Sequence, residues 1–281
     1  MTIEAYYRPE TLEEALDLSA EYRSSLDIIS GGTIAMPAIN EGKTFPARVM
    51  DIRDLDLDFV ESSNGERTLG ATLTLTGVLE KIDEPFLRDA ARHTGGWSIR
   101  NMGTVGGNLF SPPPLGDFAV ALLALDAEIE VQQRDEQRWI SLSEFYAGPK
   151  STAIEADELV TAVRLPPIDG DTTYTKYTRS QEPARAIVTV AVNLERQDGV
   201  VETVRIALNG AGPHPVRMHE AEDILEGERL ERDAIERAAE AAAEGADPPE
   251  DAIASAWYRR KMIRHHLSNA LCELRNQEET K

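Results

Sequence analysis

Apolar residues recur at helical spacing near the start of the chain and give way to short β-branched runs further along. Residues 11–14 have the Thr-x-x-Glu form of a capping box and precede an apolar stripe formed by Leu12, Ala15, Leu16, Ser19 and Tyr22, which predicts a first helix. A strand over 26–29 stops at Ser30-Gly31-Gly32-Thr33. The small apolar stretch 34–39 then predicts a turn of helix.

The middle of the chain continues the alternation of strand and helix. Strands are predicted over 48–51 and 68–75, and Pro85 stands in a favourable first position for a helix over 86–93. Residues 95–108 carry so many glycines that they predict a long loop. An apolar helix over 117–125 and a strand over 128–132 follow.

The pattern changes at about residue 172. Strands are predicted over 174–179, 187–194 and 201–208, and helices over 231–244 and 254–271 come after them. This order predicts a separate α+β domain with a three-stranded sheet and helices on one face. The boundary falls near residues 166–171.

Composition describes a globular protein without a membrane span. In the 281 residues no apolar run approaches the roughly 18 to 20 residues that a span requires. The N-terminal MTIEA has neither the basic start nor the apolar stretch of a signal peptide, which predicts a cytoplasmic protein.

Acidic residues strongly outnumber basic ones. Fifty Asp and Glu against 29 Lys and Arg give a net charge of -21, which disfavours nucleic acid as a partner because that binding depends on cationic contacts. Only six of the cations are Lys, and acid is spread along the whole chain. These features indicate a surface adapted to high salt, as in a halophilic protein.

Cysteine and histidine offer little metal chemistry. The single cysteine, Cys272, excludes an intrachain disulfide and any all-Cys iron–sulfur site on this chain alone. His265 and His266 are adjacent on a predicted helix and point about 100° apart, so we assign no metal site. The carboxylate pairs are those expected by chance at this acidity, and we assign no catalytic residue.

Two glycine-bearing segments are the strongest candidates for ligand binding. Ser30-Gly31-Gly32-Thr33 follows a strand and opens a helical turn, so successive amide N–H groups can converge on an anion. The segment lacks the third glycine of a GxGxxG fingerprint and the Gly-Lys of a P-loop. A second segment, Thr104-Val105-Gly106-Gly107-Asn108, also offers backbone N–H donors beside a hydroxyl and an amide side chain. Two such segments suit a long ligand with two polar stretches.

The joint pattern resembles the FAD subunits of molybdenum hydroxylases, such as the medium subunit of aerobic carbon monoxide dehydrogenase and the flavin segment of xanthine dehydrogenase. The motifs that carry the resemblance are Gly31-Gly32-Thr33, Ile99-Arg100-Asn101-x-Gly103-Thr104-x-Gly106-Gly107-Asn108, Ser111-Pro112, Asp117, Tyr174-Thr175-Lys176, Asn209-Gly210-Ala211-Gly212 and Tyr258-Arg259-Arg260. They cover nearly the whole chain.

The resemblance implies a p-cresol methylhydroxylase-type FAD-binding domain over 1–168, with lobes of about 1–55 and 56–168. A carbon monoxide dehydrogenase flavoprotein-type C-terminal domain over 172–277, with a three-stranded antiparallel sheet and helices, would follow. FAD would lie between the lobes without a covalent link, since His93, the nearest candidate for attachment, falls within a predicted helix.

The cofactor contacts are carried over position by position. Residues 28–35 and 104–108 would line the pyrophosphate and ribityl chain, Asp117 would accept hydrogen bonds from ribityl or ribose hydroxyls, and Lys176 would approach the isoalloxazine. The full set is Ile28, Ile29, Ser30, Gly31, Gly32, Thr33, Ile34, Ala35, Asn101, Gly103, Thr104, Val105, Gly106, Gly107, Asn108, Ser111, Asp117, Val160 and Lys176.

The resemblance also implies partners. A large subunit with the molybdenum cofactor would oxidise the substrate, a small subunit with [2Fe-2S] clusters would pass electrons on, and the FAD of this chain would hand them to an acceptor. A dimer of such heterotrimers is expected. Two alternatives remain open: a free-standing FAD-dependent oxidase of the vanillyl-alcohol oxidase type, and a flavin-free assembly module that keeps the fold.

Overall fold

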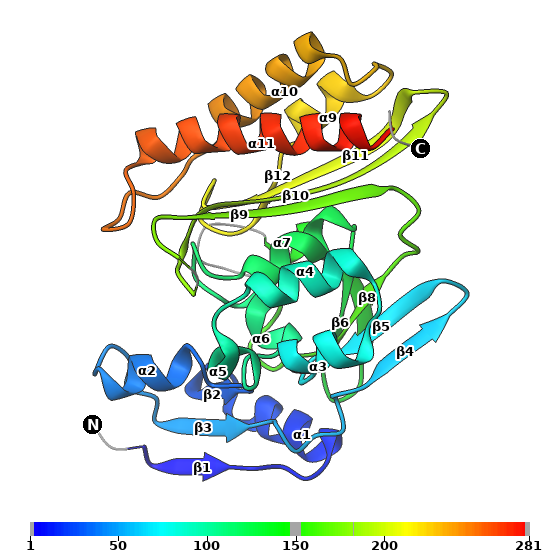
Figure 1. The fold of residues 1–281 in the computed structure, drawn as a ribbon. Helices are drawn as coiled ribbons and strands as arrows, with labels where there is room; N and C mark the ends of the chain where they lie inside the picture. The colour runs from blue at the N-terminus through cyan, green and yellow to red at the C-terminus, as the bar shows by residue number, and fades with distance from the viewer. Residues whose placement is uncertain (1–2, 147–152, 182, 279–281) are drawn as a thin grey trace.

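Three β-sheets, stacked along the length of the molecule, organise the fold (Figure 1). The computed structural model of the protein describes residues 3–146, 153–181 and 183–278. A three-stranded sheet lies at one end, a five-stranded sheet in the middle and a four-stranded sheet at the other end. The α+β class expected from the sequence is confirmed.

The N-terminal lobe is a parallel sheet in the order β1 (Ala5–Tyr7), β3 (Arg48–Asp51), β2 (Leu26–Ile29). Helix α1 (Leu12–Tyr22) begins where predicted: the Thr11 side chain accepts a hydrogen bond from the Glu14 amide. The Glu14 carboxylate reaches back to the Glu10 amide, one residue before the position that a capping box uses. After α1 come the short helix η1 (Arg23–Ser25) and then β2, which leads into α2 (Ala35–Asn40).

The middle lobe is an antiparallel sheet in the order β4 (Val60–Ser63), β5 (Glu66–Gly70), β8 (Leu159–Leu165), β6 (Glu128–Gln132), β7 (Gln137–Ser141). Four helices of this lobe are α3 (Leu75–Lys81), α4 (Pro85–His93), α7 (Asp117–Ala124) and α8 (Leu142–Phe145). Every residue of α7 is buried, because the helix also packs against the next domain. The strand predicted over 68–75 ends at Gly70, since Thr74 caps α3.

Residues 95–108 differ from the long loop expected. They contain two short helices, α5 (Trp97–Arg100) and α6 (Val105–Leu109). The Thr104 side chain caps α6 by accepting from the Gly107 amide, and the carbonyls of Leu73 and Ala71 accept from Val105 and Gly106. Gly106 permits this contact, since a Cβ there would lie 2.8 Å from the Ala71 Cβ.

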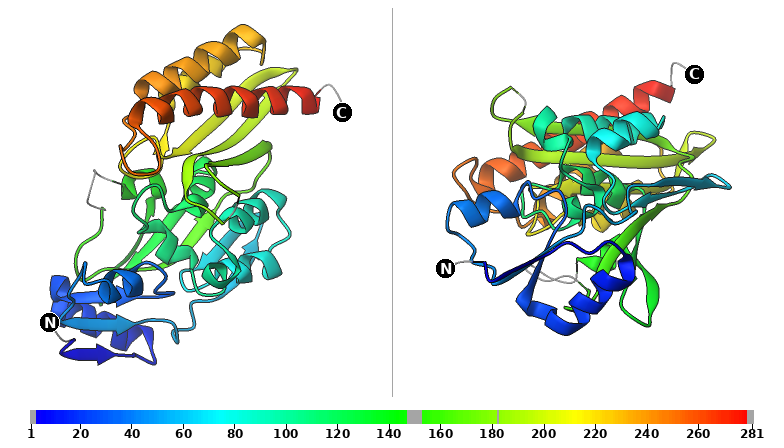
Figure 2. Two further views of the ribbon diagram at one scale, coloured as in Figure 1. Left: turned by 60° about the vertical axis from the view of Figure 1, so that its left-hand side comes forward. Right: turned by 90° about the horizontal axis from the view of Figure 1, so that it is seen from below.

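The C-terminal domain is an antiparallel sheet in the order β12 (Val216–Arg217), β11 (Val200–Asn209), β10 (Ala186–Gln197), β9 (Asp171–Thr178). The three long strands are those predicted, whereas the two-residue β12 adds a fourth that is too short to leave a pattern. Helices α9 (His219–Leu225), α10 (Arg232–Gly245) and α11 (Ala256–Glu278) cover one face, and α4 and α7 lie under the other (Figures 1 and 2). Nowhere in the described ranges does a helix have the length and apolarity to cross a membrane.

Candidate functional site

The first glycine segment, residues 30–35, leaves the carboxyl edge of the parallel sheet directly after β2. Ligands of open parallel sheets bind at this edge. Within the described part of the chain, no oxygen accepts a hydrogen bond from the amides of five successive residues: Gly31, Gly32, Thr33, Ile34 and Ala35. Gly31 is buried and the other four residues are half-buried, at the start of α2. Successive N–H groups that are not bonded within the protein can converge on an anion, so this run of donors marks a candidate place for an anionic ligand.

The second glycine segment, residues 101–108, touches the first. The hydroxyls of Ser30 and Thr104 are 3.1 Å apart, although 74 positions separate them in the sequence. A Cβ on Gly31 would lie 1.8 Å from the Met102 carbonyl oxygen, so only glycine allows the segments to approach this closely. The structure therefore brings both predicted segments into one site.

The two segments do not offer the same chemistry. In the second, the amides of Val105, Gly106 and Asn108 donate to backbone carbonyls, and the Gly107 amide donates to the Thr104 hydroxyl. These N–H groups are satisfied inside the protein and are not available to a ligand. We expected amide donors from both segments. Within the described residues the second segment keeps only the Thr104 amide without an acceptor, and the Thr104 hydroxyl already donates to the Ser30 hydroxyl.

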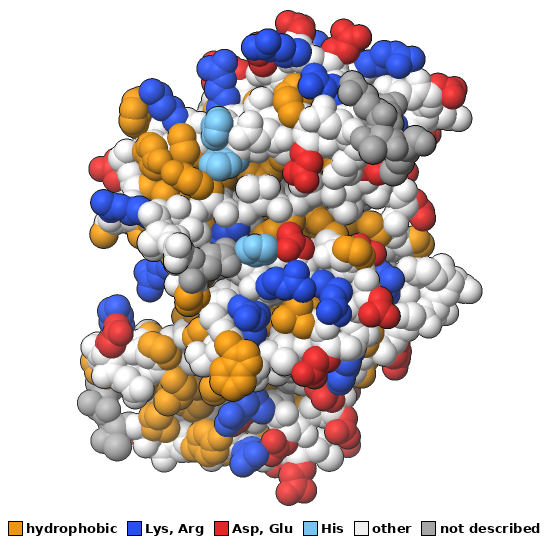
Figure 3. Space-filling view, viewed as in Figure 1, with side chains coloured by type: hydrophobic (Ala, Val, Ile, Leu, Met, Phe, Trp, Pro, Cys, Tyr) orange, Lys and Arg blue, Asp and Glu red, His pale blue; other side chains and the backbone are white. Residues whose placement is uncertain are grey.

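Exposed apolar side chains flank the two segments. Ile28 is 38% exposed, Met36 42%, Met102 49% and Trp97 74%. Figure 3 shows hydrophobic side chains gathered on the part of the surface where Figure 1 places α2, β2 and α5. Apolar surface beside anion-binding amides suits a ligand that combines flat rings with phosphate.

Asp117 and Lys176 meet in a nearly closed cluster between α7 and the C-terminal sheet. The Lys176 Nζ lies 2.9 Å from the Asp117 Oδ2, and the two side chains are 2% and 6% exposed. Lys176 also donates to the His93 carbonyl at 2.7 Å. The Thr189 hydroxyl donates to the Asp117 Oδ1 at 2.7 Å. The cation expected beside a flavin ring is thus already paired with a carboxylate.

The other predicted residues lie around the second glycine segment, α7 and the core of the middle lobe. The Asn108 side chain accepts from the Ala119 amide at 2.9 Å, which ties the second segment to the start of α7. The Ser111 amide donates to the Asn108 carbonyl, and the Asn101 side chain accepts from the Thr76 hydroxyl at 2.6 Å. Val160 is 5% exposed in the core of the middle lobe and makes no side-chain polar contact.

The predicted contact set lacks three residues that surround Asp117, although Tyr174 and Asn209 stand in motifs that carried the resemblance. Thr189 binds the Asp117 carboxylate, the Tyr174 hydroxyl donates to its backbone carbonyl at 3.2 Å, and the Asn209 amide group holds the turn before it. Thr189 left one usable signal, as a single hydroxyl within the apolar run of residues 187–192.

Asp51 stands beside the first segment at the end of β3 and is 2% exposed. Burial pulls the pKa of its carboxyl upward, but hydrogen bonds from Arg53 and Tyr6 outweigh that effect and leave the pKa at about 2. The group is therefore ionised at neutral pH and fixed by its partners, which suits a structural role at the carboxyl edge.

These features fit a flavin adenine dinucleotide. Its diphosphate matches the free amides and the Ser30 hydroxyl, which Thr104 orients by donating to it, and its rings match the apolar surfaces of Trp97 and its neighbours. Gly31 keeps the two segments together, because a Cβ there would clash with the Met102 carbonyl.

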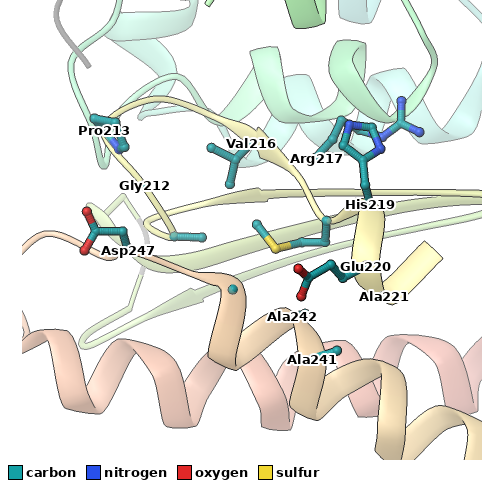
Figure 4. Close-up of a pocket in the computed structure, with 13 residues that line it drawn as sticks. Gly212, Pro213, Val216, Arg217, His219, Glu220, Ala221, Ala241, Ala242 and Asp247 are labelled. Carbon is teal, nitrogen blue, oxygen red and sulfur yellow. The ribbon is translucent and has the colours of Figure 1, made fainter. Parts of the chain in front are cut away.

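A separate cavity of about 330 Å³ lies in the C-terminal domain, between β12, α9 and the end of α10 (Figure 4). Its lining combines apolar side chains, among them Val216 and Met218, with the acidic Glu220 and Asp247. No residue predicted to touch the cofactor lines it, and the glycine segments lie in other lobes.

Comparison with protein families decides between the possible ligands. A family model described as the FAD binding domain in molybdopterin dehydrogenase matches residues 1–168. The chain belongs to this family. A second model, described as the CO dehydrogenase flavoprotein C-terminal domain, matches residues 172–274. The resemblance and the fold implied by the sequence are confirmed, and this member of the family is an FAD-binding oxidoreductase subunit.

Individual relatives match over nearly their full length. The glyceraldehyde dehydrogenase medium chain of Sulfolobus acidocaldarius is 29% identical, with 92% of this chain and 94% of that protein covered. The 6-hydroxypseudooxynicotine dehydrogenase complex subunit alpha of Paenarthrobacter nicotinovorans is 31% identical, with 95% of this chain and 93% of that protein covered. Among solved structures, reconstituted CO dehydrogenase from Oligotropha carboxidovorans has a chain with a TM-score of 0.89 and 26% identity, covering 98% of each.

Proposed function

We propose that this subunit binds one FAD non-covalently and relays electrons within a molybdenum hydroxylase complex. The observation that carries the proposal is the run of free amides from Gly31 to Ala35, which follows the Ser30 hydroxyl that Thr104 orients. When bound, FAD supplies the electron-transfer chemistry, and the protein supplies binding and orientation.

The chain's own groups divide the work of binding. The amides of the first segment donate hydrogen bonds that stabilise the charge of the diphosphate, so no cationic side chain is needed. This mode of binding suits a protein whose net charge is -21. The Asp117 carboxylate accepts from Thr189 and is paired with Lys176, and its remaining lone pairs accept hydrogen bonds from hydroxyl groups of the cofactor. Lys176 positions that carboxylate, and Trp97 with Met102 excludes water from the rings. The remaining predicted residues are proposed as further contacts. Those of residues 105–108 would not act through their amides, which are bonded within the protein, and Val160 would act from the core of the middle lobe.

Two partner subunits complete the proposed complex. A large subunit would carry the molybdenum cofactor. A small subunit would carry [2Fe-2S] clusters, which deliver electrons to the FAD. The three subunits would form a heterotrimer, and two heterotrimers would form a dimer. Support comes from the relatives, one of which is a medium chain and another a subunit of a dehydrogenase complex. We place the complex in the cytoplasm.

The domain division belongs to the same proposal. We assign 1–168 to FAD binding, with lobes of about 1–55 and 56–168, and 172–277 to the C-terminal domain; the ranges of the two matching family models support it. We also propose that the excess of acid is an adaptation to high salt.

The two alternatives have less support. A free-standing oxidase of the vanillyl-alcohol oxidase type needs a large substrate-capping domain, whereas this chain and its relatives match end to end at similar length. A flavin-free assembly module is less favoured because residues 1–168 match the model of an FAD binding domain.

Flavin uptake by the full chain tests the proposal. The purified protein is incubated with excess FAD in molar KCl, and the flavin that remains after gel filtration is quantified. One FAD for each chain, released by acid precipitation, is the expected result. Absence of flavin contradicts the proposal, and yellow colour that stays with the precipitate favours the oxidase. Purification from the native cell, with assays for molybdenum and iron, tests the partners.

A further inference from the structure

Three polar side chains stand in one row across the C-terminal sheet. Thr189 on β10 is paired in register with Lys176 on β9 and with Asn209 on β11. Directly opposite residues on neighbouring strands project from the same face of a sheet. The N-terminal end of α7 packs against that face. The three side chains, here called the polar row (Lys176, Thr189 and Asn209), therefore contact this end of the helix.

All three members grip one short segment of the flavin domain. The Asn209 Nδ2 donates to the carbonyls of Pro114 and Leu115, both at 3.0 Å. Thr189 donates to the Asp117 Oδ1 at 2.7 Å, and Lys176 lies 2.9 Å from the Oδ2. The row thus fixes both the turn that precedes Asp117 and each oxygen of its carboxylate.

Packing alone does not account for the Thr189 hydroxyl. Both Thr189 and Asn209 are 0% exposed, and Ala191 and Ala207 nearby belong to an apolar core. A valine would fill the same volume without burying a hydroxyl, which costs free energy unless it is hydrogen-bonded. The single use that the structure shows for this hydroxyl is its bond to Asp117, where the donor holds the carboxyl group in one rotamer.

We propose that Thr189 is a positioning residue that sets the Asp117 carboxylate for the flavin nucleotide, so that the C-terminal domain controls cofactor affinity without lining the glycine segments. This inference rests on the proposed function of the site. A carboxylate has about four lone-pair sites, so two donors from the row leave acceptor capacity for the ligand.

The test measures the FAD dissociation constant of the full chain by titration with fluorescence detection. Thr189→Val removes the hydroxyl and keeps the shape, and we expect it to raise the dissociation constant about tenfold. Thr189→Ser restores the donor and is expected to bind FAD nearly as tightly as the unmodified chain. A role in packing alone predicts the reverse order, because serine loses the methyl group and valine keeps the volume.

Thr173→Val is the matched control. Thr173 is also buried in the C-terminal sheet and also donates to a carboxylate, that of Glu273 on α11 at 3.1 Å, but it faces away from the flavin domain. Thermal unfolding without FAD compares the damage that each valine does to the fold. Equal affinity of the two valine variants, or failure of Thr189→Ser to restore binding, overturns the positioning role. An unmodified chain that takes up no FAD contradicts the proposed function instead.

Discussion

Gly31 is the residue at which the two glycine segments come closest, and the demand on it is steric. A Cβ at this position would lie 1.8 Å from the Met102 carbonyl oxygen and 3.0 Å from the Gly103 Cα. Both neighbours are backbone, so no side chain can rotate away. One segment must then move relative to the other, and the Ser30 and Thr104 hydroxyls separate.

Gly31→Ala is therefore expected to cost at least about 2 kcal/mol of unfolding free energy and to abolish retention of FAD. Urea unfolding and flavin content after gel filtration measure the two effects. Gly245→Ala is the control, because a Cβ there meets nothing closer than the Glu220 Oε2 at 3.7 Å and the residue ends a helix. A Gly31→Ala protein with normal stability and bound flavin would show that the segments do not need this contact.

Asp51 makes a prediction about acid stability. Its folded pKa of about 2 lies below the unfolded value of about 3.9, so its contribution is present above pH 4 and is lost as the pH falls through 2. The shift corresponds to about 2 to 3 kcal/mol. Asp51→Asn is expected to be less stable by about that amount at pH 5, with the difference disappearing near pH 2. Urea titrations at several pH values measure it, with the exposed Asp56→Asn as control, and a difference that is constant with pH would refute the linkage.

At the scale of elements, α11 is held to the sheet by a buried cation. Arg259 is 0% exposed, donates to both oxygens of Asp251 at 2.9 and 2.8 Å, and also binds the Ile187 carbonyl at the start of β10. One guanidinium thus joins the helix, the loop that precedes it and the strand beneath.

Arg259→Met is expected to lower the unfolding free energy by about 3 kcal/mol. It leaves the Ile187 carbonyl without this donor and removes the charged partner of Asp251, whose carboxylate keeps the Ile253 and Ala254 amides. Arg264→Met on the same helix is the control, because its pair with Glu240 is 57% and 44% exposed and such pairs contribute little. Thermal and urea unfolding distinguish the two variants. Similar losses in both would mean that the buried pair does not anchor the helix.

The elements that the sequence predicted well are those whose signal is local. Strands 26–29, 48–51 and 128–132 were predicted at their observed bounds, and Thr11 caps its helix as its side chain suggested. The loop prediction for 95–108 was wrong because α6 depends on carbonyls of Leu73 and Ala71, which lie more than thirty positions earlier. The contact of Gly31 with Met102 and the pairing of Lys176 with Asp117 are long-range in the same way. The sequence identified the residues, whereas only the fold shows which groups are already occupied.

At the scale of the whole molecule, charge is the dominant feature. Acidic residues exceed basic ones by 21, so even if every Lys and Arg were paired, 21 carboxylates would remain to repel one another. Exposed pairs such as Arg232 with Glu236 weaken as salt rises, but each contributes little. Repulsion among the excess carboxylates extends over the whole surface and is screened by the same salt.

Salt should therefore stabilise the protein. The Debye length falls from about 10 Å at 0.1 M to about 3 Å at 1 M, and we expect the melting temperature to rise by several degrees over this range in KCl. Sucrose at matched osmolality is the control. It is excluded from the protein surface as a stabilising salt is, but it does not screen the repulsion between carboxylates. The same argument applies to the cofactor: FAD is an anion that approaches a negative protein and is held by amides, so its affinity should also rise with KCl. A melting temperature that stays constant or falls with KCl would show that ion pairs outweigh the excess charge and would remove the case for adaptation to high salt.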